Sequence, residues 1–146
     1  ILGQAIYKQN NPKPSSKAIS PNSSKLIPSD LTEDEKAVLS PPSPDASAEE
    51  RKKHDALAAK LSKESDGLDI SNRHSNPLVL RIKINKNLKV KNNDIVHNTL
   101  IFDDTHKYQI AKNSTTNLKV DFGHGAGLYG YICEGVGLTG FILVTP

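Results

Sequence analysis

The feature that most constrains the fold of this chain is a change of residue pattern near Pro77. The residues before Pro77 are rich in Pro, Ser, Asn and Lys, whereas those after it alternate between apolar and polar side chains. Alternation with a period of two is typical of strands that are buried on one face. We therefore predict a mainly β fold, a small antiparallel sandwich or barrel of about six strands that spans residues 77–146.

The pairing register of two hairpins can be predicted from the apolar residues that must lie on the buried face of the sheet. A three-residue loop at 104–106 would place Phe102 opposite Tyr108, with both rings on the buried face. In the last hairpin, a turn at residues 135–136 would place Tyr131 opposite Gly140. An aromatic ring laid over a strand glycine covers backbone that would otherwise be exposed.

The first half of the chain is predicted to be a tether that carries helical pieces. Residues 1–46 form a Pro/Ser-rich segment with too few large apolar side chains to offset chain entropy, apart from a short helix predicted at 31–39 with Asp30 as its cap. Ser47 and Glu50 have the spacing of a capping box, which predicts an amphipathic helix over 47–66. The expected organisation is thus a disordered tether, one helix and a β domain.

The first residues indicate a location outside the cytoplasm. Residues 1–7 resemble the trailing end of an apolar helix, with Tyr7 beside Lys8 where the apolar run ends, as at a membrane interface. The alternative is a frayed terminus or an added edge strand, and composition does not decide between them. We predict an extracytoplasmic, membrane-associated protein, periplasmic if bacterial, with a membrane tether upstream of Ile1.

Side chains capable of catalysis or metal binding are few and scattered. Cys133 is the only cysteine, and its spacing from His97, His106 and His124 matches no compact metal-ligand pair. The glycines of 123–130 run on into a strand rather than into a helix, which is unlike a phosphate-binding loop. These observations predict no enzyme activity, no catalytic residues, no metal and no cofactor.

Net charge favours one alternative function. The chain carries 19 Lys and Arg against 16 Asp and Glu, and the whole excess of +3 lies after residue 75. A stripe of basic side chains along neighbouring strands would bind a polyanion, as in small barrels that hold single-stranded nucleic acid. Its members would be Arg81, Lys83, Lys89 and Lys91.

The last strand favours the leading interpretation, a non-catalytic protein-interaction module held by its tether to a membrane or a larger assembly. Residues 138–144 carry no charge, so a strand here must be internal or covered by a partner. We predict that another protein binds this strand by strand addition, or docks on the helix at 47–66. The predicted contact residues are Leu138, Thr139, Phe141 and Leu143.

Overall fold

The computed structural model describes residues 31–102 and 106–146. Two helices and ten strands occur in this part of the chain. The helices are α3 (Glu33–Val38) and α4 (Ala48–Leu61). The strands are β1 (Lys63–Glu64), β2 (Gly67–Ser71), β3 (His74–Asn76), β4 (Val79–Lys83), β5 (Asn87–Asn92), β6 (Asn98–Phe102), β7 (His106–Ile110), β8 (Ser114–Lys119), β9 (Gly127–Cys133) and β10 (Gly137–Thr145).

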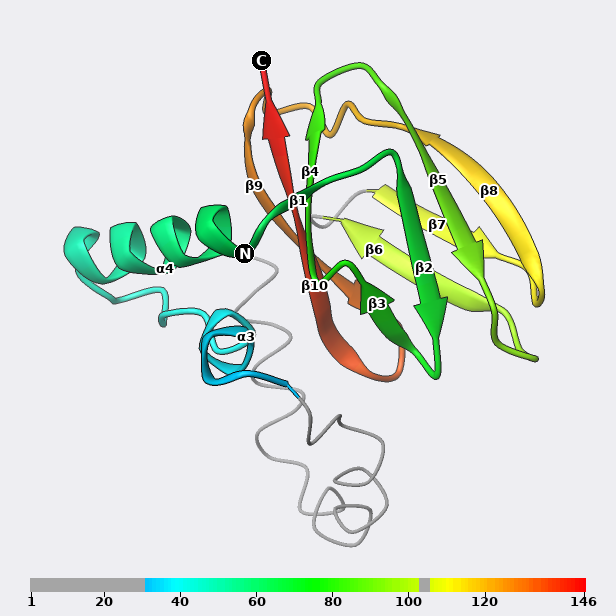
Figure 1. The fold of residues 1–146 in the computed structure, drawn as a ribbon, viewed down its shortest axis with the longest axis horizontal. Coiled ribbons are helices and arrows are strands. Elements are labelled where there is room, and N and C mark those ends of the chain that lie inside the picture. Colours follow the sequence, from blue (N-terminus) through cyan, green and yellow to red (C-terminus); the bar gives the residue numbers. More distant parts are fainter. Residues whose placement is uncertain (1–30, 103–105) are drawn as a thin grey trace, which may run out of the picture.

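The strands form two sheets that face each other, so the predicted mainly β sandwich is confirmed (Figure 1). The larger sheet has the order β1-β4-β10-β9-β6-β7 and the smaller one β3-β2-β5-β8. Three strand pairs are parallel: β1 with β4, β4 with β10, and β2 with β5. The sheets are therefore mixed, because the chain crosses repeatedly from one sheet to the other instead of forming hairpins throughout.

Strands begin at residue 63, well before the change of pattern at Pro77. Strand β2 turns Leu68 and Ile70 into the core and leaves Asp69 exposed. This strand is central in the smaller sheet, where it pairs with β3 and β5. Two apolar side chains in a polar stretch are a weak sequence signal, which is why the prediction of six strands is too low.

The core is closed by aromatic side chains from the larger sheet and from the segment that follows β8. Phe102 of β6 stacks on Phe122 with ring centroids 4.8 Å apart, and Tyr131 of β9 lies 5.0 Å from Phe102. All three side chains are nearly or fully buried. Offset and tilted ring pairs of this kind stabilise beyond the area that they bury.

The register predicted for the first hairpin is wrong by two residues. Phe102 lies opposite His106, and Leu100 lies opposite Tyr108. Asp104 falls in the loop of 103–105, outside the described residues. A shift of two residues keeps every side chain on its predicted face, so burial alone cannot distinguish the two registers. The last hairpin is confirmed, because Tyr131 pairs with Gly140 and Phe141 with Gly130.

Both helices begin with a complete capping box. Ser47 and Glu50 cap α4 as predicted, with Ser47 Oγ accepting from the Glu50 amide at 3.2 Å. Helix α3 is capped by Thr32 with Glu35, rather than by Asp30. Helix α4 ends at Leu61, earlier than predicted, because Ser62 is extended and Lys63 pairs with β4.

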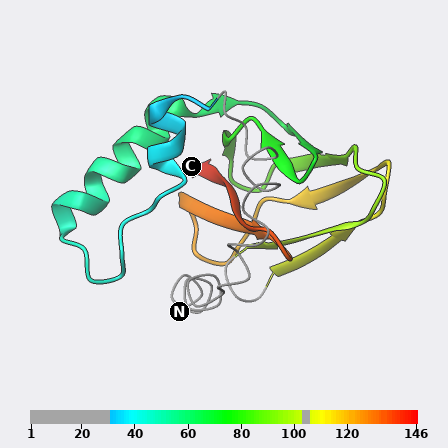
Figure 2. The same ribbon diagram turned by 90° about the horizontal axis from the view of Figure 1, so that it is seen from below.

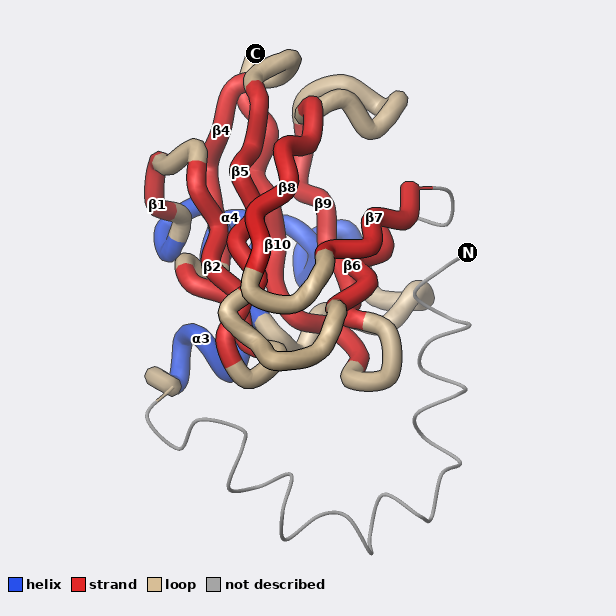
Figure 3. Tube along the Cα trace, turned by 90° about the vertical axis from the view of Figure 1, so that its right-hand side faces the viewer, coloured by secondary structure: helices blue, strands red, loops and turns tan. Residues whose placement is uncertain are grey.

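The helices pack against the outer face of the larger sheet. Figures 1 and 2 show both helices on one side of the sandwich, and in Figure 3, seen from the opposite side, α4 lies behind the strands. Val38 and Ala58 are fully buried against Val79 and Phe141. His54 of α4 joins these elements, since its Nε2 lies 2.8 Å from the Val38 carbonyl oxygen and its ring lies edge-on, 5.3 Å from Phe141.

The predictions for residues 1–7 and for most of the tether lie outside the described residues. Within 31–102 and 106–146, neither helix has the length and apolar character needed to cross a bilayer. The division into a tether, a helix and a β domain at Pro77 is untested. We propose a different unit, residues 32–146, because α3 and α4 share a core with β4 and β10.

Limited proteolysis with trypsin tests whether residues 32–146 form one unit. Helix α4 contains four trypsin sites, at Arg51, Lys52, Lys53 and Lys60. We expect the stable fragment to retain α4, with slow cleavage at these four sites. The His54→Ala change removes a ring contact and a hydrogen bond, about 1.4 kcal/mol or more together, so cleavage in α4 should accelerate roughly tenfold. Mass spectrometry of the fragments over time reports both results.

The Glu49→Ala variant is the control, because Glu49 forms only an exposed pair with Lys53. Its cleavage rate should match that of the unchanged protein. Immediate cleavage throughout α4 in the unchanged protein, leaving a fragment that begins near residue 63, would contradict the proposed unit.

Candidate functional site

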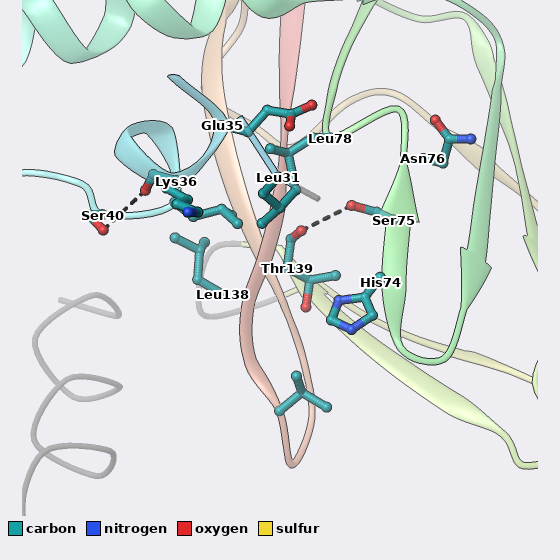
Figure 4. A pocket seen from close by; sticks show the side chains of 12 residues that line it. Leu31, Glu35, Lys36, Ser40, His74, Ser75, Asn76, Leu78, Leu138 and Thr139 are labelled. Carbon is teal, nitrogen blue, oxygen red and sulfur yellow. Dashed lines mark hydrogen bonds between the residues drawn. The ribbon is translucent and has the colours of Figure 1, made fainter. Parts of the chain in front are cut away.

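A cavity of about 590 Å³ lies between α3 and the edge of the sandwich formed by β3 and the start of β10 (Figure 4). Its size falls within the range of small-molecule sites in proteins, about 300–1,000 Å³. Segments far apart in the sequence build its walls. The lining residues are Leu31, Glu35, Lys36, Leu39, Ser40, His74, Ser75, Asn76, Leu78, Val136, Leu138 and Thr139.

The helix side and the floor of this cavity differ in character. Leu31 and Leu39, which flank α3, line the cavity together with Leu78 and Leu138 of the sandwich, and Glu35, Lys36 and Ser40 add polar groups on the helix side. His74, Ser75 and Asn76 come from β3, where they provide a polar floor. A cavity that combines apolar side chains with a small number of polar groups is the usual form of a site for a small organic molecule.

The two hydroxyl groups on the floor are already engaged. Ser75 Oγ donates to the Thr139 carbonyl oxygen at 2.9 Å. Thr139 Oγ1 donates to the Gly137 carbonyl oxygen at 2.9 Å and accepts from the Cys133 amide at 3.0 Å. The Ser75 hydroxyl therefore links β3 to β10 and the Thr139 hydroxyl links β10 to β9, and Ser75 is not arranged as a nucleophile beside His74.

His74 is the exception among the polar groups of the floor. Its Nε2 atom is buried, and no described residue lies in hydrogen-bonding position to it. A buried polar atom without a partner costs about 1–3 kcal/mol, so native structures retain few of them. The atom is covered by the surrounding residues, so the ring must turn toward the cavity before the nitrogen can form a hydrogen bond with a bound molecule.

A second polar feature lies at the nearby end of the sandwich, around the buried Cys133. Asn98 Oδ1 lies 3.5 Å from Cys133 Sγ, and Asn98 Nδ2 donates to Asn92 Oδ1 at 2.8 Å and to Asp94 Oδ2 at 2.9 Å. Asn92 and Asn98 are buried. Sequence analysis missed this group because Asn and Asp in loops are usually turn formers, and only the fold brings them to the cysteine.

Two opposing effects act on the Asp94 carboxyl group. Partial burial raises its pKa, but hydrogen bonds from Asn98 and from the Arg73 and Asn72 amides outweigh burial, so the net pKa lies below the usual 3.8. A lowered pKa in the folded state means that Asp94 stabilises the fold above its unfolded pKa and that this contribution is lost as the pH falls through the folded value.

The predicted partner-binding residues lie in an interior strand. β10 pairs with β9 along one edge and with β4 along the other, so strand addition at β10 is excluded where both neighbours are in place. Phe141 and Thr139 are buried, and Leu138 is half-buried in the core beneath the helices. The uncharged strand is thus covered from within the chain, by β4 and β9 along its edges and by α3 and α4 on its outer face.

The predicted basic stripe is divided between the two sheets. Arg81 and Lys83 belong to β4 of the larger sheet, whereas Lys89 and Lys91 belong to β5 of the smaller one. Both pairs alternate with core residues and point outward, so they lie on opposite faces of the sandwich. They do not form one groove for a polyanion.

The candidate metal ligands are also separated. His106 pairs with Phe102, which lies opposite Tyr131, whereas Cys133 lies opposite Leu100 in the middle of β6. Across the described ranges, no three side chains of the types His, Cys, Asp and Glu form a group that could hold a metal ion.

No protein-family model matches this sequence, and no curated protein is similar to it at a significant level. Several solved structures are similar in fold. A Cu-containing nitrite reductase from Thermus scotoductus SA-01 matches over 55% of this chain and 22% of its own length, at 16% identity and a TM-score of 0.45. A reduced mutant form of amicyanin matches over 60% of this chain and 89% of its own length, at 19% identity and a TM-score of 0.48.

A purple cupredoxin from Nitrosopumilus maritimus matches over 54% of this chain and 98% of its own length, at 15% identity and a TM-score of 0.45. This chain spans less than a quarter of the nitrite reductase. At these identities and TM-scores the likeness concerns the arrangement of strands in the sandwich and assigns no activity to this chain.

The function predicted from the sequence is nevertheless corrected. The interpretation as a non-catalytic protein-interaction module, with a nucleic-acid-binding barrel as the alternative, is wrong. The similar sandwiches belong to copper proteins, a nitrite reductase, amicyanin and a purple cupredoxin. In addition, the strand and the basic stripe that carried the two interpretations do not form the expected surfaces.

The residues of this chain do not fit a copper centre either. Copper sites in electron-transfer proteins use a cysteine thiolate together with two imidazoles. Here the polar side-chain atom beside Cys133 Sγ is the Asn98 amide oxygen, and no three-membered ligand group occurs in 31–102 and 106–146. We therefore derive no electron-transfer step for this chain.

Proposed function

We propose that this protein binds a small organic molecule in the cavity beneath α3. The ligand has a mainly apolar body, which lies against the four leucines of the lining, and one polar group, which forms a hydrogen bond with His74 Nε2 once the ring has turned toward the cavity. The observation that supports the proposal is the buried, unpartnered nitrogen in the floor of a cavity of about 590 Å³. The role is binding, not catalysis, because Ser75 and Thr139 are engaged in structural hydrogen bonds.

The apolar part of the ligand supplies most of the binding free energy in this proposal. Burying apolar surface stabilises a complex by roughly 25 cal/mol per Å², although ordering costs remove part of this gain. The hydrogen bond to His74 adds about 0.5–1.5 kcal/mol to the binding free energy, the usual net contribution of one hydrogen bond, and it gives the buried nitrogen a partner. Affinity should therefore depend on the filling of the cavity first and on His74 second.

The test uses a fluorescent anilinonaphthalene sulfonate dye, which has an apolar body and one polar group. We expect the dye to bind the full chain at one site with increased emission. His74→Ala should weaken its affinity about threefold to tenfold, the equivalent of one hydrogen bond. Val136→Trp should abolish binding, because Val136 is half-exposed in a turn, where a larger side chain can enter the cavity without disturbing the core.

The matched control is Ile95→Ser, since Ile95 is the most exposed large apolar side chain in the described part of the protein, at 81%, and does not line the cavity. This variant should bind the dye as the unchanged protein does. Equal affinity in the unchanged protein, His74→Ala and Val136→Trp would overturn the proposal, and loss of binding in Ile95→Ser would place the dye on the surface instead.

An extracytoplasmic location, membrane association and a protein partner are also proposed. The first two rest on the sequence of residues 1–7, and the partner rests on the long Pro/Ser-rich tether, which would let the domain reach across a gap. Fractionation of cells that express the gene with its own upstream sequence tests the location. Recovery of the protein from the soluble cytosolic fraction would contradict it. Crosslinking in the same cells tests for a partner.

A further inference from the structure

Three chain segments meet at the end of the sandwich that holds Cys133. The Asp94 carboxylate, in the loop between β5 and β6, accepts hydrogen bonds from the amides of Asn72 and Arg73 in the turn between β2 and β3. The Glu134 amide, at the end of β9, donates to the Thr99 carbonyl oxygen at 2.8 Å. The side chains of Asn92 and Asn98 lie between these segments, so this end is held together by polar contacts.

The direction of every hydrogen bond in this group follows from Asn92. Its Nδ2 atom lies 2.9 Å, 3.0 Å and 3.2 Å from the carbonyl oxygens of Val96, Ile110 and Ala111, which can only accept. The opposite atom of the amide is therefore the oxygen. This Oδ1 atom accepts from the Asp94 amide at 2.9 Å and from Asn98 Nδ2 at 2.8 Å.

The orientation of Asn98 follows in turn. Its Nδ2 faces two acceptors, Asn92 Oδ1 and Asp94 Oδ2, so its Oδ1 must be the atom 3.5 Å from Cys133 Sγ. An amide oxygen cannot donate a hydrogen bond. The contact can only form if the sulfur carries the hydrogen.

The charges around Cys133 agree with a neutral thiol. Burial raises the pKa of Cys133, and Arg73, which acts in the opposite direction, is countered by the negative charges of Asp94 and Glu134. A thiolate here would be a fully buried anion facing an amide oxygen, with no hydrogen-bond donor among the described side chains to replace water. Metal coordination by cysteine requires the thiolate.

We infer that Cys133 is a neutral thiol that donates a hydrogen bond to Asn98, and that the Asn92–Asn98–Asp94 network, not a copper ion, holds this end of the sandwich together. The network already links the turn between β2 and β3, the loop between β5 and β6, and the end of β9. The inference concerns residues outside the proposed ligand interaction with His74, so either can fail without the other.

The first test is infrared spectroscopy of the full chain. Because Cys133 is the only cysteine, an S–H stretching band in this protein belongs to it alone. We expect the band at full intensity in the folded protein from neutral pH to about pH 9, above the usual cysteine pKa of about 8.5, and its fall to roughly a quarter of that intensity on unfolding at the higher pH. Cys133→Ala must lack the band under all conditions. Absence of the band from the folded, unchanged protein at neutral pH would overturn the inference.

The second test is titration of the full chain with copper(II), and with copper(I) under reducing conditions. We expect no visible absorption band from a copper–thiolate bond and no increase in Tm, with or without a chelator, because no group of three ligating side chains in 31–102 and 106–146 holds the ion and the Cys133 thiol stays protonated. A visible band that saturates at one copper per chain, raises Tm and disappears in Cys133→Ser would overturn the inference. Cys133→Ser should retain most of the stability, since its hydroxyl group can donate to Asn98 in place of the thiol.

Discussion

A methyl group added at position 140 should be among the most damaging single changes in this protein. In Gly140→Ala the new Cβ would lie 2.6 Å from the Tyr131 hydroxyl oxygen, 2.7 Å from Ser75 Oγ and 2.8 Å from the Leu78 carbonyl oxygen. The last of these atoms is backbone, so the strand itself must move. We expect the free energy of unfolding to fall by about 3 kcal/mol, the upper end for overpacking of a core, as measured by urea denaturation.

Two other glycines provide controls for this change. Gly67→Ala meets only Ser65 Oγ at 3.9 Å, an ordinary contact, so its stability should stay within about 0.5 kcal/mol of the unchanged protein. Gly130→Ala meets the Phe141 ring at 3.1 Å and should be intermediate, because a side chain can shift by a few tenths of an ångström. Gly140→Ala and Gly67→Ala of equal stability would show that the contact between β3 and β10 is not as close as described.

Loss of the Asn92 side chain should be equally costly, for a polar rather than a steric reason. Asn92→Ala leaves the carbonyl oxygens of Val96, Ile110 and Ala111 without this donor, and Asn98 Nδ2 loses one of its two acceptors. Each unsatisfied buried group costs about 1–3 kcal/mol, although partial access to water reduces the sum. We expect a loss of about 3 kcal/mol in the free energy of unfolding, again measured by urea denaturation.

The Asn92→Asp variant tests the direction of the hydrogen bonds, because it keeps the shape of the side chain and places a carboxylate oxygen against three carbonyl oxygens. It should be at least as destabilising as Asn92→Ala at neutral pH. Asn93→Ala is the matched control, since the exposed Asn93 side chain makes one hydrogen bond, to Ser71 Oγ at 3.2 Å. Full stability in Asn92→Asp would contradict the orientation assigned to Asn92, and with it the role assigned to Cys133.

Local patterns in the sequence predicted several elements correctly because the forces that form them act over short distances along the chain. The period of two identified β4, β5 and β8, and the Ser47–Glu50 capping box identified the start of α4. The pairing of Tyr131 with Gly140 followed from the need to cover a glycine and was confirmed. The register of the β6–β7 hairpin was not determined, because a shift of two residues preserves both faces.

The candidate cavity could not be predicted in the same way. Its lining comes from α3, β3 and the turn before β10, which are separated by more than a hundred residues at the extremes. His74 carries no distinguishing sequence pattern, because nothing local separates a solvated ring from one with a buried nitrogen atom. A polar side chain at the end of a short strand is a weak signal that could at most have drawn attention to it.

By itself, the sequence of this protein determined that it forms a mainly β sandwich, where most strands alternate, and where α4 begins, because alternation and capping depend on neighbours in the chain. Only the tertiary structure decided that β10 is interior, that the basic residues lie on opposite faces, and that Asn92, Asn98 and Cys133 meet. These outcomes depend on which strands become neighbours across long connections, and that choice is made by the packing of the whole core rather than by any one segment.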